Sequence, residues 1–224
     1  YFVTVEQGLK DAGFTVTSEK WLDSYDAVRA QAKKNFIAEV NRIAKEKKTM
    51  PMLESMGRVM AEPEYQLPLD ADGDTAVYVL ARNSGEGNDR KPEAGDVKLT
   101  ETEIRDILEC SRRYSRFMLV LNVGGVVDLS PVVDGVSNIL LIAQPGIAVG
   151  DALADVLRGK AYPSGKLAST WAAWQDYCPV AEFGDPNDTR YKEGIYVGYR
   201  YFDTVDKAPL FPFGYGLAYT QFAF

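Results

Sequence analysis

Residues 76–90 read AVYVLARNSGEGNDR, and they join an apolar run to a glycine-rich loop. The run at 76–81 is short, apolar and rich in β-forming side chains, as expected of an interior strand in a parallel sheet. Ser84, Gly85 and Gly87 then break the pattern. Ligands of open α/β sheets bind outside the carboxyl ends of the strands, where this loop would lie. Glu86 is therefore a candidate functional residue, although glycine-rich turns after strands often carry only a solvated carboxylate.

The segments that follow extend the α/β pattern. Thr100 and Glu103 form a capping box, which predicts a helix from there to about Tyr114. Apolar runs at 117–123 and 138–144 predict two further strands, with another helix after the second. Alternating strands and helices with right-handed crossovers indicate a layered, mostly parallel sheet.

The residues before residue 76 are assigned from periodicity and from helix-breaking residues. We expect a short helix that ends at Gly13, a strand at 14–17 and a helix from about 21 to 48. Residues 49–74 mix methionines with prolines and are interpreted as an irregular excursion. An α/β domain normally opens on a strand, so we expect the first strand to lie upstream of Tyr1 in a longer protein.

From residue 162 to 224 the sequence is rich in proline, glycine and aromatic residues and has no clear periodicity. Tyrosines and phenylalanines crowd between residues 191 and 222. Such rings could stack on the faces of sugars in a cleft, or they could pack an extended tail across the domain. Packing is the commoner use of aromatic side chains and is favoured for most of them.

The 224 residues carry 32 acidic and 25 basic side chains, for a formal net charge of -7. A hydrophobic content of 46% is that of a globular protein with a sizeable core. The negative charge disfavours nucleic acid and anionic membranes as partners. No apolar run reaches the roughly 18 residues of a membrane helix, and the first residues lack the basic start of a secretion signal. We expect a soluble protein, with the cytoplasm favoured over secretion, although its true N-terminus is expected to be absent.

Cysteine and histidine content narrows the chemistry. Cys110 and Cys178 are far apart and in no metal-binding spacing, so the sequence indicates no disulfide framework, metal site or other cofactor. The chain has no histidine, which excludes Ser-His-Asp and Cys-His catalysis and histidine-bound metals. Acid and base chemistry would fall to carboxylates, lysines or tyrosines.

Four segments form a recognisable series along the chain, and the third and fourth are specific enough that chance is a poor explanation. They are SGEGNDRK at 84–91, PGIAVGDALADVLRGKAYPSGKL at 145–167, EGIYVGYRYF at 193–202 and FPFGYGLAYT at 211–220. Together they resemble the second, α/β-sandwich domain of family 3 glycoside hydrolases of the β-glucosidase type. The resemblance covers roughly residues 76–224, and the first 75 residues match more loosely. It implies that residues 1–224 form one domain of a larger enzyme, a three-layer α/β/α sandwich with about six mostly parallel strands.

The resemblance implies retaining hydrolysis of a β-linked glucoside or oligosaccharide. In such enzymes a nucleophilic Asp lies on a separate (β/α)8 barrel of the same protein, and the sandwich domain supplies a Glu as general acid/base, which corresponds to Glu86. Ser84, Asp89 and Arg90 are then expected to bind substrate or position the loop, with Asp89 and Arg90 as an ion pair or helical turn. Whether the protein forms a homo-oligomer stays open.

The chain also departs from the family pattern. No segment resembles the barrel motif that holds the nucleophilic Asp, so the chain alone is expected to be inactive. Ile147-Ala148 and Leu167-Ala168 replace the usual Gln-Glu and Leu-Pro, which suggests a divergent subgroup.

Two other interpretations of the chain stay open. One is a non-catalytic structural or carbohydrate-binding module in which Glu86 is idle. The other is a flavodoxin-like nucleotide domain with a phosphate loop at 84–87. It is disfavoured because Glu86 stands where a phosphate cradle needs bare backbone amides.

Overall fold

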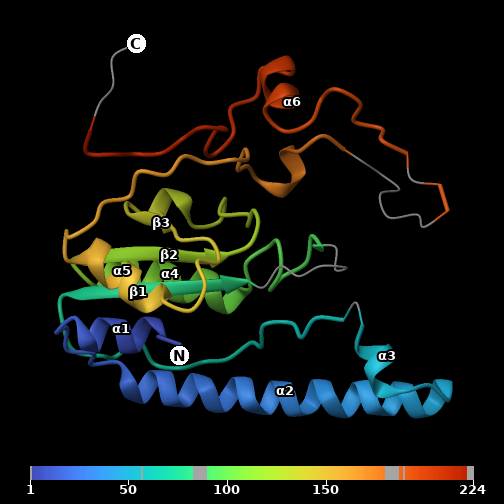
Figure 1. Ribbon diagram of the computed structural model, residues 1–224, viewed down its shortest axis with the longest axis horizontal. Helices are drawn as coiled ribbons and strands as arrows, with labels where there is room; N and C mark the ends of the chain where they lie inside the picture. Colours follow the sequence, from blue (N-terminus) through green and yellow to red (C-terminus); the bar gives the residue numbers. More distant parts are fainter. Residues whose placement is uncertain (1, 57, 83–89, 180–186, 189, 221–224) are drawn as a thin grey trace.

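A parallel three-stranded sheet lies at the centre of the computed structural model, which describes residues 2–56, 58–82, 90–179, 187–188 and 190–220 (Figure 1). The strands are β1 (Thr75–Arg82), β2 (Arg116–Val123) and β3 (Ile139–Leu141), in the order β1-β2-β3. β1 and β2 pair along their full length, with Thr75 opposite Arg116 and Arg82 opposite Val123. The α/β class and the strands expected at 76–81 and 117–123 are therefore confirmed.

The expected count of about six strands is not confirmed, since the described residues form three. Residues 14–17 were expected to be a strand, which is wrong: they have no regular structure, and Thr17 donates a hydrogen bond from its hydroxyl to the Asp72 carbonyl. A strand needs a neighbour with which to pair, and an alternating tetrapeptide does not supply one. The strand expected at 138–144 is shorter, because Ala143 takes a φ of 54° that β structure cannot accommodate.

Helix α4 (Glu101–Arg113) covers one face of β1 and β2. Both bonds of the predicted capping box form at its start, so that prediction is confirmed. Its inward face contributes Ile107 and Cys110 to the main core, where they meet Leu80 of β1 and Leu119 and Leu121 of β2. All five side chains are buried. Burial of this apolar face, more than helix propensity, holds the helix on the sheet.

Helices α1 (Val5–Asp11) and α5 (Val149–Leu157) pack against each other. Gly8 and Gly150 meet at the crossing, where a Cβ on Gly8 would collide with the backbone of Gly150. Val3 adds two backbone hydrogen bonds, donating to the Ile147 carbonyl before α5 at 2.9 Å and accepting from the N–H of Gly150 in the first turn of α5 at 3.2 Å. The first expected helix is thus confirmed, and Gly13, whose φ is 86°, follows its C-cap residue Ala12 and closes the helix as predicted.

Helix α2 (Glu19–Lys47) runs along one side of the molecule and carries α3 (Pro51–Ser55) beyond the end of the sheet (Figure 1). Its N-terminal half is tied to the domain by aromatic contacts, with the Trp21 and Tyr25 rings stacked at 5.3 Å and Tyr65 edge-on to both. The helix expected from about 21 to 48 is confirmed. None of the described helices combines the length and apolar character needed to cross a bilayer.

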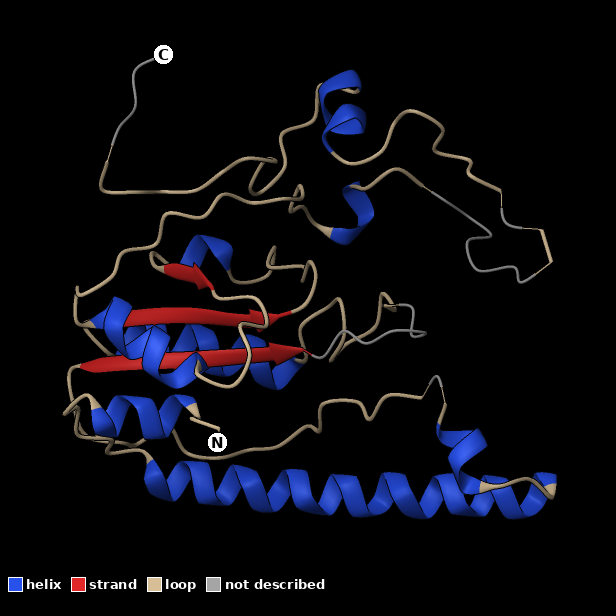
Figure 2. Ribbon diagram, viewed as in Figure 1, coloured by secondary structure: helices blue, strands red, loops and turns tan. Residues whose placement is uncertain are grey.

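The C-terminal part lies largely in loops on the other side of the sheet from α2 (Figure 2). It contains the short helices η2 (Trp174–Asp176) and α6 (Tyr199–Thr204), while η1 (Val133–Gly135) precedes β3. Residues 167–171 and 211–215 lie side by side, and Trp171 and Phe211 form an antiparallel bridge with backbone hydrogen bonds of 2.8 and 3.0 Å. Trp171 is buried, but Tyr191 and Tyr219 are 82% and 86% exposed, so only part of the aromatic belt packs within this chain.

Candidate functional site at the carboxyl end of β1

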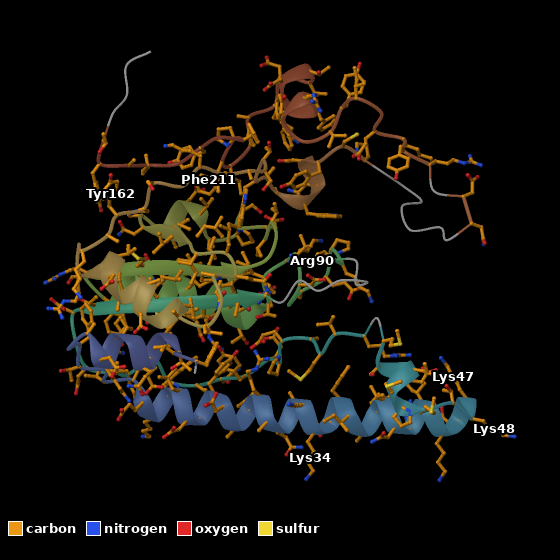
Figure 3. All side chains as sticks on the ribbon, viewed as in Figure 1. Lys34, Lys47, Lys48, Arg90, Tyr162 and Phe211 are labelled. Atoms are coloured by element: carbon orange, nitrogen blue, oxygen red, sulfur yellow. The ribbon has the colours of Figure 1, made fainter. Side chains whose placement is uncertain are left out.

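The carboxyl end of β1 is where the sequence predicts function. Arg82 is the last residue of the strand, and Arg90 is the next described residue, located beyond the tip of β1 (Figure 3). The candidates Ser84, Glu86 and Asp89 lie outside the described residues. The geometry of the site therefore comes from the two flanking arginines and the groups that hold them.

Arg82 is a buried guanidinium with all its nitrogens engaged. Nη1 and Nη2 donate to Oε1 and Oε2 of Glu103 at 2.7 and 2.6 Å. Nη1 also donates to the Ala81 carbonyl at 2.9 Å, and Nε donates to the Asp96 carbonyl at 2.9 Å. A buried charge of this kind is tolerated because a bidentate carboxylate and further acceptors replace its water. The end of the strand is thereby fixed to its surroundings.

Glu103 extends this network into α4. Its Oε2 accepts the backbone N–H of Thr100 at 2.8 Å, and the Thr100 hydroxyl accepts the N–H of Glu103 at 3.1 Å. The carboxylate thus caps the helix and neutralises Arg82 at the same time. The positive end of the helix dipole also favours a carboxylate in the first turn. Strand end and helix start are consequently one rigid unit.

Asp96 binds the chain at Arg90 and Lys91, directly after residue 89. Its Oδ1 accepts from Nε of Arg90, and its Oδ2 accepts the backbone N–H of Lys91 at 2.7 Å. Since its carbonyl accepts from Arg82, one residue is bonded to the chain on both sides of 83–89. We call these contacts of Asp96 with Arg82, Arg90 and Lys91 the Asp96 clamp. Arg90 Nη2 is buried and has no hydrogen-bond partner in the described part of the chain.

The position of Asp96 is itself set by the core. Its neighbour Val97 is buried, and the Val97 carbonyl accepts the N–H of Asp128 at 2.8 Å. The Asp128 carboxylate in turn accepts from the N–H and hydroxyl of Ser130, and from the N–H of Trp174 at 2.9 Å. These bonds connect the loop after β1 to the loop after β2 and to the C-terminal part.

Three described carboxylates at this edge are engaged with donors. Glu103 is committed to Arg82 and the helix cap, Asp96 to the clamp, and Asp128 to three donors. Burial raises the pKa of Tyr78 on β1 well above its ordinary value, which keeps that phenol neutral. Within the described ranges no group of three or more His, Cys, Asp or Glu side chains could hold a metal ion.

Sequence reasoning identified Arg90 but not its described partner. The partner expected for Arg90 was Asp89, which lies outside the described residues, whereas the structure pairs Arg90 with Asp96. Glu103 is predicted only as a capping residue, and no role is predicted for Arg82. A charged side chain at the end of an apolar strand was the available signal for a buried ion pair, because such a charge needs a partner.

Comparison with known proteins places the chain. The model of the family described as "Glycosyl hydrolase family 3 C-terminal domain" matches residues 3–219. The chain belongs to this family. Among curated relatives of this family 3 domain, beta-glucosidase A of Butyrivibrio fibrisolvens is 39% identical over 181 residues, which cover 68% of this chain and 22% of that protein. Thermostable beta-glucosidase B of Acetivibrio thermocellus is 42% identical over 130 residues, or 57% of this chain and 17% of that protein.

Solved structures agree with the assignment. Beta-glucosidase 3B of Thermotoga neapolitana, in complex with alpha-D-glucose, is 33% identical with a TM-score of 0.73, over 99% of this chain and 31% of that one. A beta-glucosidase from Paenibacillus barengoltzii is 32% identical with a TM-score of 0.70, over 100% of this chain and 24% of that one. The family 3 domain thus spans no more than about a third of the length of these relatives.

Proposed function

We propose that residues 1–224 form the sandwich domain of a retaining β-glycosidase that acts on a β-linked glucoside or oligosaccharide. Glu86 is its general acid/base, and it acts in an active site shared with a (β/α)8 barrel that carries the nucleophilic Asp. Family membership supports the reaction class, as do relatives that are named beta-glucosidases and are several times longer than this chain. Ser84, Asp89 and Arg90 bind the substrate or position the loop, and no metal or cofactor takes part.

The chemistry needs one carboxyl group from each domain. As the barrel Asp attacks the anomeric carbon, Glu86 gives its proton to the glycosidic oxygen and the C–O bond breaks, releasing the alcohol. The ionised Glu86 then takes a proton from water, whose oxygen attacks the anomeric carbon and displaces the Asp. Retaining enzymes hold the two carboxyl groups about 5 to 5.5 Å apart, which requires a carboxylate projected beyond the edge of this domain.

One observation carries the assignment to Glu86. The carboxylates of Glu103, Asp96 and Asp128 near the end of β1 are already hydrogen-bonded to arginine, serine or backbone donors, which favours a carboxylate of the 83–89 segment as the proton donor. Both ends of the segment that contains Glu86 are fixed to the domain by Arg82 and Arg90. A general acid needs such a rigid support, because its rate advantage depends on geometry.

The test is chemical rescue in the full-length protein. Glu86→Ala is expected to lower turnover of an aryl β-glucoside, and sodium azide is expected to restore it with β-glucosyl azide as the product. Azide can attack the glycosyl-enzyme without a general base, so only loss of the acid/base is rescued in this way. The matched control is Glu93→Ala, an exposed carboxylate in the same connection, with turnover like that of the parent. Undiminished turnover of Glu86→Ala would contradict the proposal and leave the non-catalytic module as the remaining interpretation.

A further inference from the structure

We propose that Asp96 is a positioning residue for the acid/base of this domain. The proposal rests on the function proposed for Glu86. Its basis is the Asp96 clamp, in which three oxygen atoms of one residue hold the chain before and after residues 83–89. Asp96 does not touch substrate in this scheme; it fixes the distance and direction between the two ends of the segment that carries Glu86.

The clamp needs a carboxylate at this position. Oδ1 accepts from a guanidinium and Oδ2 accepts from a backbone amide, so both oxygens act as acceptors at once. An asparagine has one carbonyl oxygen and an NH2 group, and the NH2 group cannot accept a hydrogen bond from either partner. Asp96→Asn therefore keeps the shape of the side chain and loses one of the two bonds.

The loss of one bond at Asp96 is expected to act on geometry more than on the core. The Asp96 side chain is 32% exposed, so the substitution leaves no buried cavity. The Arg82 side still has its two bonds to Glu103. On the other side the Arg90 guanidinium has no second described acceptor, and the backbone bond of 3.2 Å from Val97 N to the Lys91 carbonyl remains. The substitution therefore loosens the re-entry side of the segment, and an error of about 1 Å at a catalytic group can cost about 100-fold in rate.

Leaving-group dependence separates positioning from a merely structural role. Protonation matters for a poor leaving group such as the glucose of cellobiose, and hardly at all for 2,4-dinitrophenolate. In the full-length protein, Asp96→Asn is expected to lower kcat/KM for cellobiose by about 10- to 100-fold, and for 2,4-dinitrophenyl β-glucoside by less than about 3-fold. Equal losses on both substrates would overturn the proposal, because reduced folding lowers both alike.

Two further variants keep the inference distinguishable from the proposed function. In a Glu86→Ala background, Asp96→Asn should change the ratio of the two kcat/KM values by less than about 2-fold, since there is no acid left to position. A further change in that ratio would show that Asp96 acts elsewhere. If Glu86→Ala itself lacks leaving-group dependence and azide rescue, the proposed function fails. If Glu86→Ala behaves as expected but Asp96→Asn does not, only the clamp fails.

A second route to the clamp covers the case in which Asp96→Asn does not fold. Arg90→Lys keeps the positive charge but removes the planar Nε that donates to Asp96 Oδ1. It is expected to show the same selective loss on cellobiose. Glu93→Gln, a change at an exposed carboxylate in the same connection, is the control and should leave both substrates unaffected. An Arg90→Lys protein with parent-like ratios would overturn the proposal.

Discussion

Arg82 and Glu103 form a two-point ion pair in the interior, with 2.7 Å between Nη1 and Oε1 and 2.6 Å between Nη2 and Oε2. Each side chain is only 5% exposed, so either charge would be stranded without the other. The pair joins the last residue of β1 to the first turn of α4, and it forms the base on which the candidate site is built.

Removing one member of this pair is expected to cost much more than removing an exposed pair. Arg82→Met should lower the free energy of unfolding by about 3–5 kcal/mol, because it leaves the Glu103 carboxylate buried and uncompensated. Arg112→Met breaks an exposed pair with Glu109 and should cost less than about 1 kcal/mol. Urea denaturation measures both. Similar losses for the two variants would contradict the interpretation of the Arg82 pair as buried.

The contact between α1 and α5 predicts a strong effect of a single methyl group. Gly8→Ala should lower the free energy of unfolding by about 1–3 kcal/mol, because the new Cβ would overlap the backbone of Gly150 and the helices must separate. Gly165→Ala is the matched control, since a Cβ there meets no described atom within 4 Å. Thermal unfolding of the two variants compares them directly, and equal midpoints would refute the close crossing.

The two cysteines are expected to differ in reactivity. Burial raises the pKa of the Cys110 thiol to about 11, so at pH 8 only about one molecule in a thousand carries the reactive thiolate there. Cys178 is half-buried in the C-terminal part. Ellman's reagent at pH 8 should therefore label one thiol quickly in the folded protein and two after denaturation. Rapid labelling of both thiols in the folded state would contradict the burial of Cys110.

Asp106 should make stability depend on pH. Burial raises the pKa of its carboxyl above the ordinary value, with Arg105 acting in the opposite direction. A raised pKa in the folded state means that stability is lost as pH rises from below the ordinary pKa through the folded pKa. Asp106→Asn lacks this loss, so its stability relative to the parent should increase as pH rises above the ordinary carboxyl pKa of about 3.9, and level off once the folded carboxyl is ionised. A stability difference between Asp106→Asn and the parent that does not change with pH would contradict this prediction.

Local signals predicted the parts of the fold that depend on local chemistry. The strands at 76–81 and 117–123 are uninterrupted apolar runs, and the helix at 101–113 begins at a capping box whose two bonds both form. The predicted strand at 14–17 failed because strands depend on pairing with distant residues. The length of the strand near 140 depended on the backbone angle at Ala143, which its residue type does not reveal.

The Asp96 clamp could not be predicted from the sequence for a similar reason. Asp96 lies in a polar, turn-rich stretch, where one more carboxylate carries no local signal. Its importance comes from three partners at positions 82, 90 and 91, which only the folded chain brings together. Arg90 could be selected from the sequence because it lies in the recognisable segment at 84–91, while Asp96 could not.

The packing of α1 on α5 has a consequence for how the protein is made. Residues 5–11 leave the ribosome before any of the three strands, yet the helix against which they pack is not complete until residue 157. Docking of α1 is therefore a late step of assembly, and it closes one of the largest loops in the chain. A nascent polypeptide that stalls before residue 149 would expose the Gly8 face of α1 to chaperones and proteases.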